Sequence, residues 1–170
     1  MEKIAVFGSA FNPPSLGHKS VIDSLNHFDR ILLVPSISHA WGKEMLDFDI
    51  RCQLIEAFIK DIDSTKVILS KLEQELVTPG KSVTTYEVLT KVEQIFPLSD
   101  ITFVIGPDNL LNFDKFYKSS EILQRWSIMV CPERIPVRST EIRRRLSENA
   151  EISDLTTPSV EGLLKQLNVY

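Results

Sequence analysis

The sequence has few of the features that mark specialised classes of protein. Two cysteines among 170 residues are too few for a disulfide framework, and Cys52 and Cys131 lie too far apart for a metal-binding pair. No apolar run approaches the length of a membrane span, and the start, with four apolar residues in a row before Gly8, is too short for a secretory signal. The net charge of −4 argues against a general nucleic-acid binder. We therefore expect one cytoplasmic domain over 1–170, with neither a membrane nor a nucleic acid as partner.

Short apolar runs rich in β-branched residues alternate along the chain with stretches of helical spacing. The runs cover 4–7, 30–34, 66–69, 101–105 and 127–130, and the helical stretches cover 16–25, 50–59, 83–96 and 110–123. Each run is bounded by Gly, Pro, Ser or a charged residue, as expected for buried parallel strands. Strands that alternate with helices of this length predict a parallel sheet covered by helices on both faces.

The remaining segments are less regular. Residues 139–170 carry no strand signal and predict two helices separated near Thr157–Pro158, so that 151–170 forms a helical tail. The longest expected loops are 35–49 and 70–81, and loops of this length are often functional.

The loop after the first run carries the strongest local signal for a ligand. It reads GSAFNPPSLGH from Gly8 to His18 and leads into a helix. Ligands of open parallel sheets bind at the carboxyl ends of the strands, and Gly8 permits close backbone approach there. The paired prolines keep the loop extended. His18 would lie in the first helical turn, where free N–H groups and the positive end of the helix dipole suit a phosphate.

The segment 134–145 holds five arginines and one glutamate, a local charge of +4 in an otherwise acidic chain. Such a patch attracts a small anionic ligand. We expect Ser139 or Thr140 to cap the following helix, so that hydroxyl, N–H groups and the Arg143 guanidinium converge on a phosphate. Arg144 and Arg145 should point elsewhere, because successive helical residues are rotated by about 100°.

Four segments, in this order, resemble the nucleotidyltransferase superfamily with a Rossmann-like fold, and within it the bacterial nicotinate-nucleotide adenylyltransferases. Residues 8–18 resemble the signature G-x-F-[D/N]-P-x-[H/T]-x-G-H, 81–89 a Ser-Tyr-Thr stretch, 105–110 a G-x-D segment and 137–143 the pattern S-[S/T]-x-x-[I/L]-R. The resemblance covers about residues 3–146 and implies a single nucleotidyltransferase domain. It also implies an α/β doubly wound, five-stranded parallel sheet of order 3-2-1-4-5 with C-terminal helices.

The activity that the resemblance implies is adenylyl transfer in NAD biosynthesis, in which ATP and nicotinate mononucleotide give deamido-NAD and pyrophosphate. His18, Ser15 and Arg143 would be catalytic, the first two as hydrogen-bond donors to the α-phosphate. The implied ATP-binding residues are Gly8, Ser9, Ala10, Phe11, His18, Gly106, Asp108, Ser139, Thr140 and Arg143. Those implied for the acceptor nucleotide are Lys43, Thr85, Asp108 and Phe116. Mg²⁺ would be bound through the ATP phosphates, so we expect no dedicated metal site.

The chain departs from the family pattern at three places. Ser15 stands where the signature has His or Thr, Ser36–Lys43 replaces a basic run, and Phe116 replaces a Trp. The acceptor could therefore be nicotinamide mononucleotide or 4′-phosphopantetheine. An adenine-nucleotide sensor with weak turnover is the alternative from another class of protein. The choice between nicotinate and nicotinamide, homo-oligomerisation and the role of residues 151–170 are left open.

Overall fold

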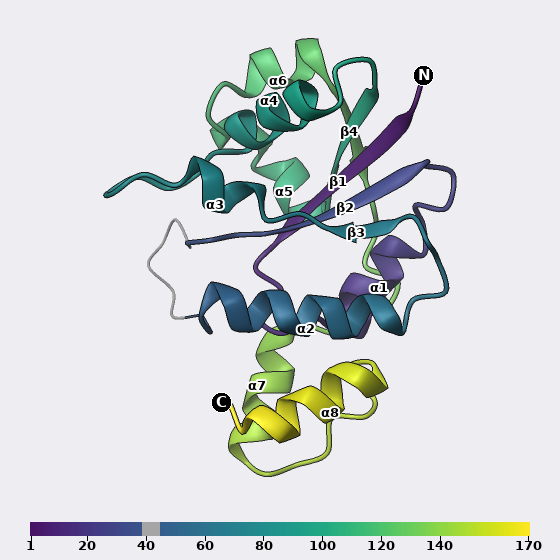
Figure 1. The fold of residues 1–170 in the computed structure, drawn as a ribbon, viewed down its shortest axis with the longest axis vertical. Coiled ribbons are helices and arrows are strands. Elements are labelled where there is room, and N and C mark those ends of the chain that lie inside the picture. The colour runs from purple at the N-terminus through teal and green to yellow at the C-terminus, as the bar shows by residue number, and fades with distance from the viewer. Residues whose placement is uncertain (39–44) are drawn as a thin grey trace.

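The computed structural model describes residues 1–38 and 45–170 and is built around one parallel sheet (Figure 1). The strands are β1 (Lys3–Ser9), β2 (Arg30–Pro35), β3 (Val67–Leu69), β4 (Asp100–Ile105) and β5 (Ser127–Val130), in the order β3-β2-β1-β4-β5. The helices are α1 (Leu16–Ile22), α2 (Phe48–Lys60), α3 (Leu72–Leu76), α4 (Thr85–Ile95), α5 (Pro107–Leu111), α6 (Ser119–Arg125), α7 (Ser139–Ser147) and α8 (Pro158–Leu167), with a 3₁₀ turn η1 at Phe113–Lys115. The predicted fold class and strand order are confirmed.

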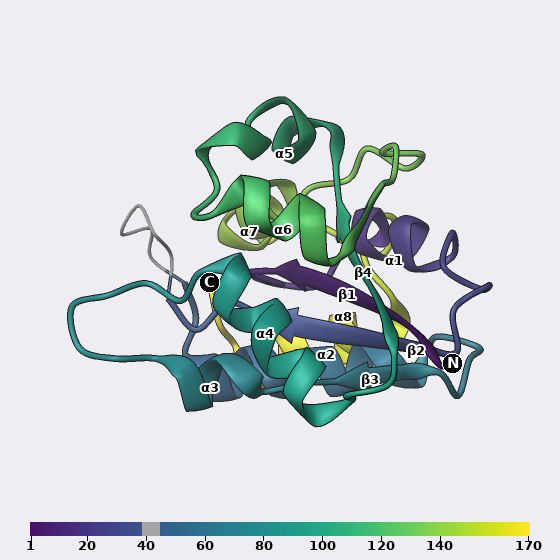
Figure 2. The ribbon, with the colours of Figure 1, turned by 90° about the horizontal axis from the view of Figure 1, so that it is seen from above.

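The central strands β1, β2 and β4 are buried on both faces, which explains why they read as nearly continuous apolar runs. In β1, Ala5 and Phe7 point into a core shared with α1, α2, α7 and α8, whereas Ile4 and Val6 point into a core shared with α3, α4 and α6. Figure 1 shows these layers, with α4 and α6 above the sheet, α2 below it, and α7 and α8 beyond α2. Seen from above, α3 lies toward the β3 edge and α5 toward the opposite edge (Figure 2).

The strand pairing opens a crevice at the carboxyl end of β1. This strand pairs with β2 as far as Ser9, opposite Pro35, but with β4 only as far as Phe7, opposite Val104. Chain connections leave the two neighbours toward opposite faces of the sheet, so on their β4 side Gly8 and Ser9 lie beside a gap rather than beside a strand. This is the switch point at which doubly wound sheets bind ligands.

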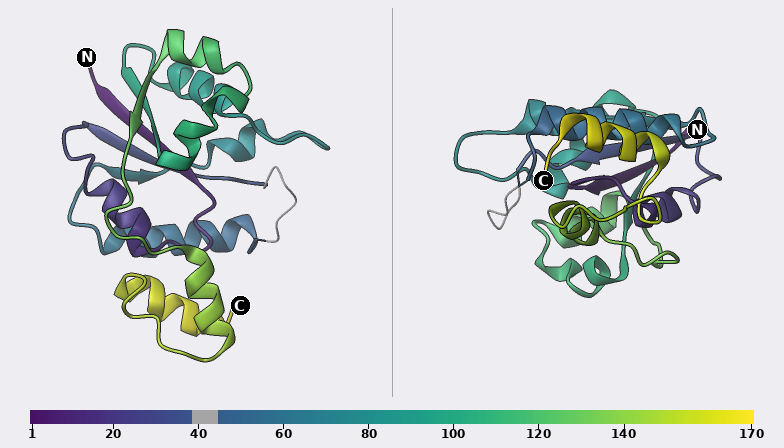
Figure 3. Two further views of the ribbon diagram at one scale, coloured as in Figure 1. Left: turned by 180° about the vertical axis from the view of Figure 1, so that it is seen from behind. Right: turned by 90° about the horizontal axis from the view of Figure 1, so that it is seen from below.

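The connection from β5 to α7 runs past the start of α1 (Figure 3). Gly17 makes this close passage possible, because a Cβ at that position would collide with the carbonyl oxygen of Val137. The C-terminal helix α8 then packs against α2. No helix in the described part of the chain has the length and apolar character needed to cross a bilayer.

Two expectations about the less regular segments need comment. The predicted loop 70–81 contains the short helix α3, so it is not structureless. Five residues are too few to show helical periodicity, although Leu72 and Leu76 pack one turn apart against the second core. The two predicted C-terminal helices are confirmed, but the break between them covers residues 148–157 and ends where Pro158 begins α8.

Candidate active site

Two cavities meet at the switch point. The larger has a volume of about 580 Å³ and the smaller about 320 Å³, and Gly8 and Asn109 belong to the walls of both. The larger cavity is lined by every residue predicted to bind ATP and also by Ser15. The smaller cavity is lined by Thr85 and Phe116, two of the residues predicted for the acceptor. Asp108 lines only the larger cavity, and Lys43 lies outside the described residues.

The loop between β1 and α1 is held in place by donors from distant segments. Its carbonyl groups at Ala10, Asn12, Pro13 and Pro14 accept hydrogen bonds, in that order, from Arg51 of α2 at 2.9 Å, Arg143 of α7 at 2.7 Å, Ser139 of α7 at 2.6 Å and Thr156 at 2.8 Å. The two prolines have no N–H group with which to form local turns. External donors therefore determine the shape of this loop.

Phe11 adds a second constraint on the same loop. Its φ of 49° lies in the left-handed region, which a bulky side chain seldom adopts. The ring is fully buried and lies 4.6 Å from the His18 ring and 5.6 Å from the Phe7 ring. The buried ring therefore holds the strained backbone in place and supports the imidazole from one side.

His18 is held as a neutral hydrogen-bond donor. The Ser15 backbone N–H donates to Nδ1 at 3.0 Å, which places the ring proton on Nε2, 3.0 Å from Ser9 Oγ. Burial lowers the pKa of His18 from 6.5 to about 4. The ring still lines the larger cavity, so its Nε2–H can donate to an anionic oxygen of a ligand in place of Ser9 Oγ.

Ser15 positions His18 in addition to lining the cavity. It is the N-cap residue of α1: its Oγ accepts from the His18 backbone N–H while the His18 ring accepts from the Ser15 backbone, a reciprocal capping box. Its hydroxyl also donates to the Val137 carbonyl at 3.4 Å, and the residue is only 1% exposed. These partners already occupy the Ser15 hydroxyl. The phosphate contact expected for Ser15 stays a prediction.

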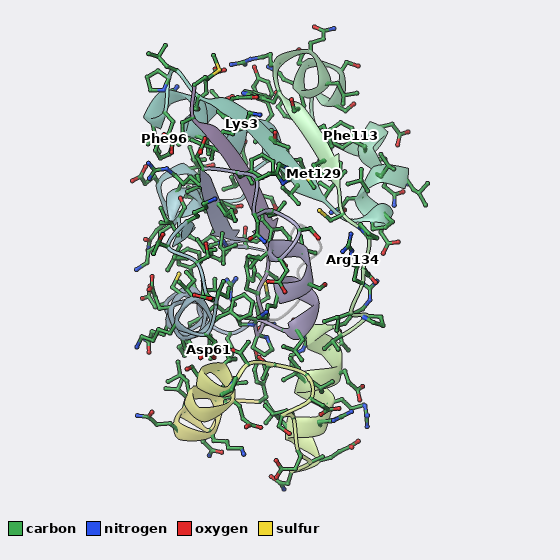
Figure 4. The ribbon with its side chains drawn as sticks, turned by 90° about the vertical axis from the view of Figure 1, so that its right-hand side faces the viewer. Lys3, Asp61, Phe96, Phe113, Met129 and Arg134 are labelled. Atoms are coloured by element: carbon green, nitrogen blue, oxygen red, sulfur yellow. The ribbon has the colours of Figure 1, made fainter. Side chains whose placement is uncertain are left out.

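Most arginines of the arginine-rich segment pair with carboxylates, and most of these carboxylates lie outside residues 134–145. Arg144 and Arg145 pair with Glu141 and do not line the cavity, as their rotation on the helix predicted. Arg138 pairs with Glu133 at 2.7 Å and lies 3.7 Å from Asp108. Arg134, labelled in Figure 4, lies on the connection that leads to α7.

Arg143 is the arginine of this segment that reaches the cavity without a carboxylate within 4 Å in the described chain. It donates to the Asn12 carbonyl and, at 3.2 Å, to Thr140 Oγ1. The predicted capping by Ser139 or Thr140 is wrong: Arg138 is the N-cap residue, and no side chain caps the helix. The Ser139 hydroxyl instead donates to Pro13, since that carbonyl has no local donor.

The smaller cavity has an aromatic wall. Phe116 stacks on Phe113 at 4.9 Å between ring centroids, and its edge meets Phe103 at 6.3 Å. Thr85 begins α4 directly after the N-cap residue Thr84, so one threonine is free to face the cavity while the other satisfies the helix. The cavity thus combines an aromatic face with a hydroxyl group.

Glu73 is a buried acid in the wall of the smaller cavity, and no sequence motif pointed to it. One carboxylate oxygen accepts from the Ile37 backbone N–H at 3.2 Å. Burial raises its pKa from 4.5 to about 7, although the Ile37 N–H and the Arg51 charge act in the opposite direction. At neutral pH this carboxyl group is therefore partly protonated.

Arg51 was also missed. It is 1% exposed and donates to three carbonyls, those of Ala10 and Ser36 at 2.9 and 2.6 Å and that of Leu46 at 2.8 Å. It therefore joins the loop of the larger cavity to the end of β2, where Ser36 lines the smaller one. An arginine on the same helical stripe as Leu54 and Ile55 was the available signal.

The carboxylates at the larger cavity are few. Among its lining residues only Asp108 and Glu133 carry one, and both lie near Arg138. The described residues contain no group of three His, Cys, Asp or Glu that could hold a metal ion. This donor set fits a cation bound mainly by ligand phosphates and water.

A doubly wound sheet with hydrogen-bond donors lining a cavity at its switch point is typical of nucleotide-binding α/β proteins. Residues 6–145 match the Cytidylyltransferase-like family model, and the chain belongs to this family. A solved structure from Vibrio parahaemolyticus, whose assigned name is nicotinate-nucleotide adenylyltransferase, is 57% identical over 97% of this chain and 99% of that chain, with a TM-score of 0.88.

More distant relatives carry the same kind of name. Proteins of Caldicellulosiruptor saccharolyticus and Staphylococcus epidermidis, assigned as nicotinate-nucleotide adenylyltransferases, are 25% and 26% identical over 99% of this chain and 98% and 97% of their own lengths. The nicotinic acid mononucleotide adenylyltransferase of Plasmodium falciparum, solved with NaAD, has a TM-score of 0.79 at 18% identity. The aligned regions cover 100% of this chain and 98% of that one, and the likeness shows the shared fold.

Proposed function

We propose that this protein is a nicotinate-nucleotide adenylyltransferase. A phosphate oxygen of nicotinate mononucleotide attacks the α-phosphorus of ATP, a new P–O–P bond forms, and the bond to pyrophosphate breaks. The products are deamido-NAD and pyrophosphate. The observation that carries this proposal is the meeting of two cavities at Gly8 and Asn109. One is lined by hydrogen-bond donors suited to phosphate, and the other by an aromatic ring and a hydroxyl. The names of the relatives point to the same activity.

The attacking phosphate oxygen is already anionic, so the reaction needs alignment and charge stabilisation rather than a base. His18 would donate its Nε2–H to the α-phosphate, exchanging Ser9 for a phosphate oxygen. The Arg143 guanidinium would hold the outer phosphates. It has five N–H groups, and the bonds to Asn12 and Thr140 use one each, so the others remain for phosphate oxygens. Phe116 and Thr85 would hold the acceptor nucleotide.

Mg²⁺ bound to the ATP phosphates would neutralise charge on the leaving pyrophosphate. Among the described residues that line the larger cavity, Asp108 and Glu133 carry carboxylates, which would accept hydrogen bonds from the water ligands of Mg²⁺, and Arg138 pairs with both. Asp108 would otherwise accept from ribose hydroxyl groups.

The proposed function is tested by pyrophosphate release from ATP and Mg²⁺ with each of three acceptors: nicotinate mononucleotide, nicotinamide mononucleotide and 4′-phosphopantetheine. We expect nicotinate mononucleotide to give the highest kcat/KM. A higher kcat/KM with another acceptor would reassign the substrate, and ATP binding without turnover of any acceptor would indicate a nucleotide sensor. A cytoplasmic location, expected from the sequence, stays a prediction.

A further inference from the structure

Asn12 joins three distant segments of the chain. Its side chain is 5% exposed and belongs to the wall of the larger cavity. The side-chain oxygen accepts from the Leu46 backbone N–H at 3.2 Å and from the Tyr170 hydroxyl at 2.5 Å. Its backbone carbonyl accepts from Arg143 Nη1 at 2.7 Å. The position of Asn12 is therefore linked directly to the guanidinium assigned to the outer phosphates.

Tyr170 reaches this loop from the far end of the chain. After α8 the last residues turn back toward the sheet (Figure 1), and Val169 packs against the first core. Burial raises the pKa of the Tyr170 phenol above its ordinary value, so it remains a proton donor, even though the Arg143 and Arg51 charges act in the opposite direction. The phenol thus lies within electrostatic reach of both arginines that hold the loop.

The geometry shows that the side-chain oxygen of Asn12 is the acceptor of both hydrogen bonds. A backbone N–H can only donate, so the atom facing Leu46 must be the oxygen, and the Tyr170 hydroxyl must donate to the same oxygen. Two donors on one oxygen hold the side chain in one orientation. Without the Tyr170 hydroxyl, only the longer Leu46 contact would hold it.

We propose that Tyr170 is a positioning residue for ATP, acting through Asn12 on the orientation of Arg143. The role rests on the proposed function, since it is Arg143 that would hold the outer phosphates. Tyr170 does not need to touch the ligand. It keeps the Asn12 carbonyl where Arg143 can bind it with one nitrogen and leave the rest of its N–H groups for phosphate.

The test compares Tyr170→Phe with Ser159→Ala. The first variant removes only the hydroxyl and keeps the ring. The second loosens α8 at a different point, because Ser159 Oγ donates at 2.7 Å to Asp61, which lies at the α2 end facing α8 (Figure 4). Titration calorimetry gives the Kd for ATP and for AMP, and scanning calorimetry gives Tm.

We expect Tyr170→Phe to weaken ATP binding about 3- to 10-fold, the equivalent of one net hydrogen bond, and to weaken AMP binding less. Ser159→Ala should lower Tm and leave the Kd for ATP unchanged. In an Asn12→Ala background, Tyr170→Phe should not change the Kd for ATP further. In an Asn12→Asp background, which keeps an acceptor oxygen, Tyr170→Phe should still weaken ATP binding.

An unchanged Kd in Tyr170→Phe overturns the proposal. Equal weakening by Ser159→Ala overturns it too, because the tail would then act only through general stability. A wild-type chain that binds ATP but releases no pyrophosphate with any acceptor rejects the proposed function alone, and the Kd comparison still decides the role of Tyr170. A wild-type chain that binds no ATP overturns both.

Discussion

The two cavities at the switch point are built in different ways. The walls of the larger one are held by long-range hydrogen bonds. Loop carbonyls between β1 and α1 accept from Arg51, Arg143, Ser139 and Thr156, which span more than a hundred positions of the sequence. The smaller one is formed by packed rings, a helix start and one buried acid. A phosphate group requires donors fixed before it arrives, since stabilisation of developing charge depends on preorganisation. A nucleoside base can be recognised by shape and stacking.

The largest effect should come from the donor in the larger cavity. His18→Ala should lower kcat by about 10²- to 10³-fold with little change in the Kd for ATP, the scale for losing one transition-state donor. Steady-state pyrophosphate release and calorimetry measure the two quantities. His27→Ala, which changes an exposed histidine, is the control. Activity within a few-fold of wild type in His18→Ala would mean that His18 does not stabilise the transition state.

Arg143→Ala should weaken ATP binding by about 1.5–3 kcal/mol, the range for hydrogen bonds to charged groups. AMP should lose less, because the outer phosphates are absent, and Arg143→Lys should recover only part of the loss, because a point charge lacks the guanidinium fork. Arg144→Ala is the matched control, since Arg144 pairs with Glu141 and Glu148 away from the cavity. Equal losses for AMP and ATP would contradict the contact with the outer phosphates.

Phe116→Leu tests whether the two cavities serve different substrates. Loss of ring stacking should raise the KM for the acceptor by the factor that corresponds to about 0.5–1.5 kcal/mol of binding free energy. The KM for ATP should stay unchanged. Tyr117→Leu, at an exposed neighbouring ring outside the cavity, should change neither. A parallel rise of both KM values in Phe116→Leu would show that the cavities cannot be assigned separately.

The smallest effect concerns stability. The pKa of Glu73 is about 7 in the folded chain against 4.5 ordinarily, so between these values the folded state binds more protons than the unfolded state. Glu73 should therefore stabilise the fold most below about pH 4.5, and this contribution should be lost as the pH rises through 7. Each kcal/mol corresponds to about 2–4 °C in Tm for a chain of this size.

Glu73→Gln removes this titration, so its Tm should exceed that of wild type by more at pH 8.5 than at pH 5.5. Thermal melts at the two pH values measure the difference. Glu75→Gln, at an exposed site paired with Lys91, is the control. A pH-independent difference between wild type and Glu73→Gln would show that the acid is ionised throughout.

Much of the fold could be predicted from the sequence because its signals are local. A strand buried on both faces is largely apolar, and the short runs at 4–7 and 101–105 show this without reference to the rest of the chain. The helix α3 could not be predicted, because five residues carry too little periodicity. The N-cap of α7 was predicted one or two residues too late, because the competing partner of Ser139, the Pro13 carbonyl, lies on a distant segment.

The sequence by itself determined the strands, the glycine–proline loop, His18 and the arginine-rich segment, because each depends on residue type and near neighbours. Only the tertiary structure decided that Ser15 caps α1, that Glu73 lines the smaller cavity, and that Arg51 and Tyr170 bind the loop of the larger one. Those outcomes depend on hydrogen-bond acceptors and buried surroundings supplied by segments far away in the chain, and a donor binds whichever unsatisfied acceptor the fold places within reach.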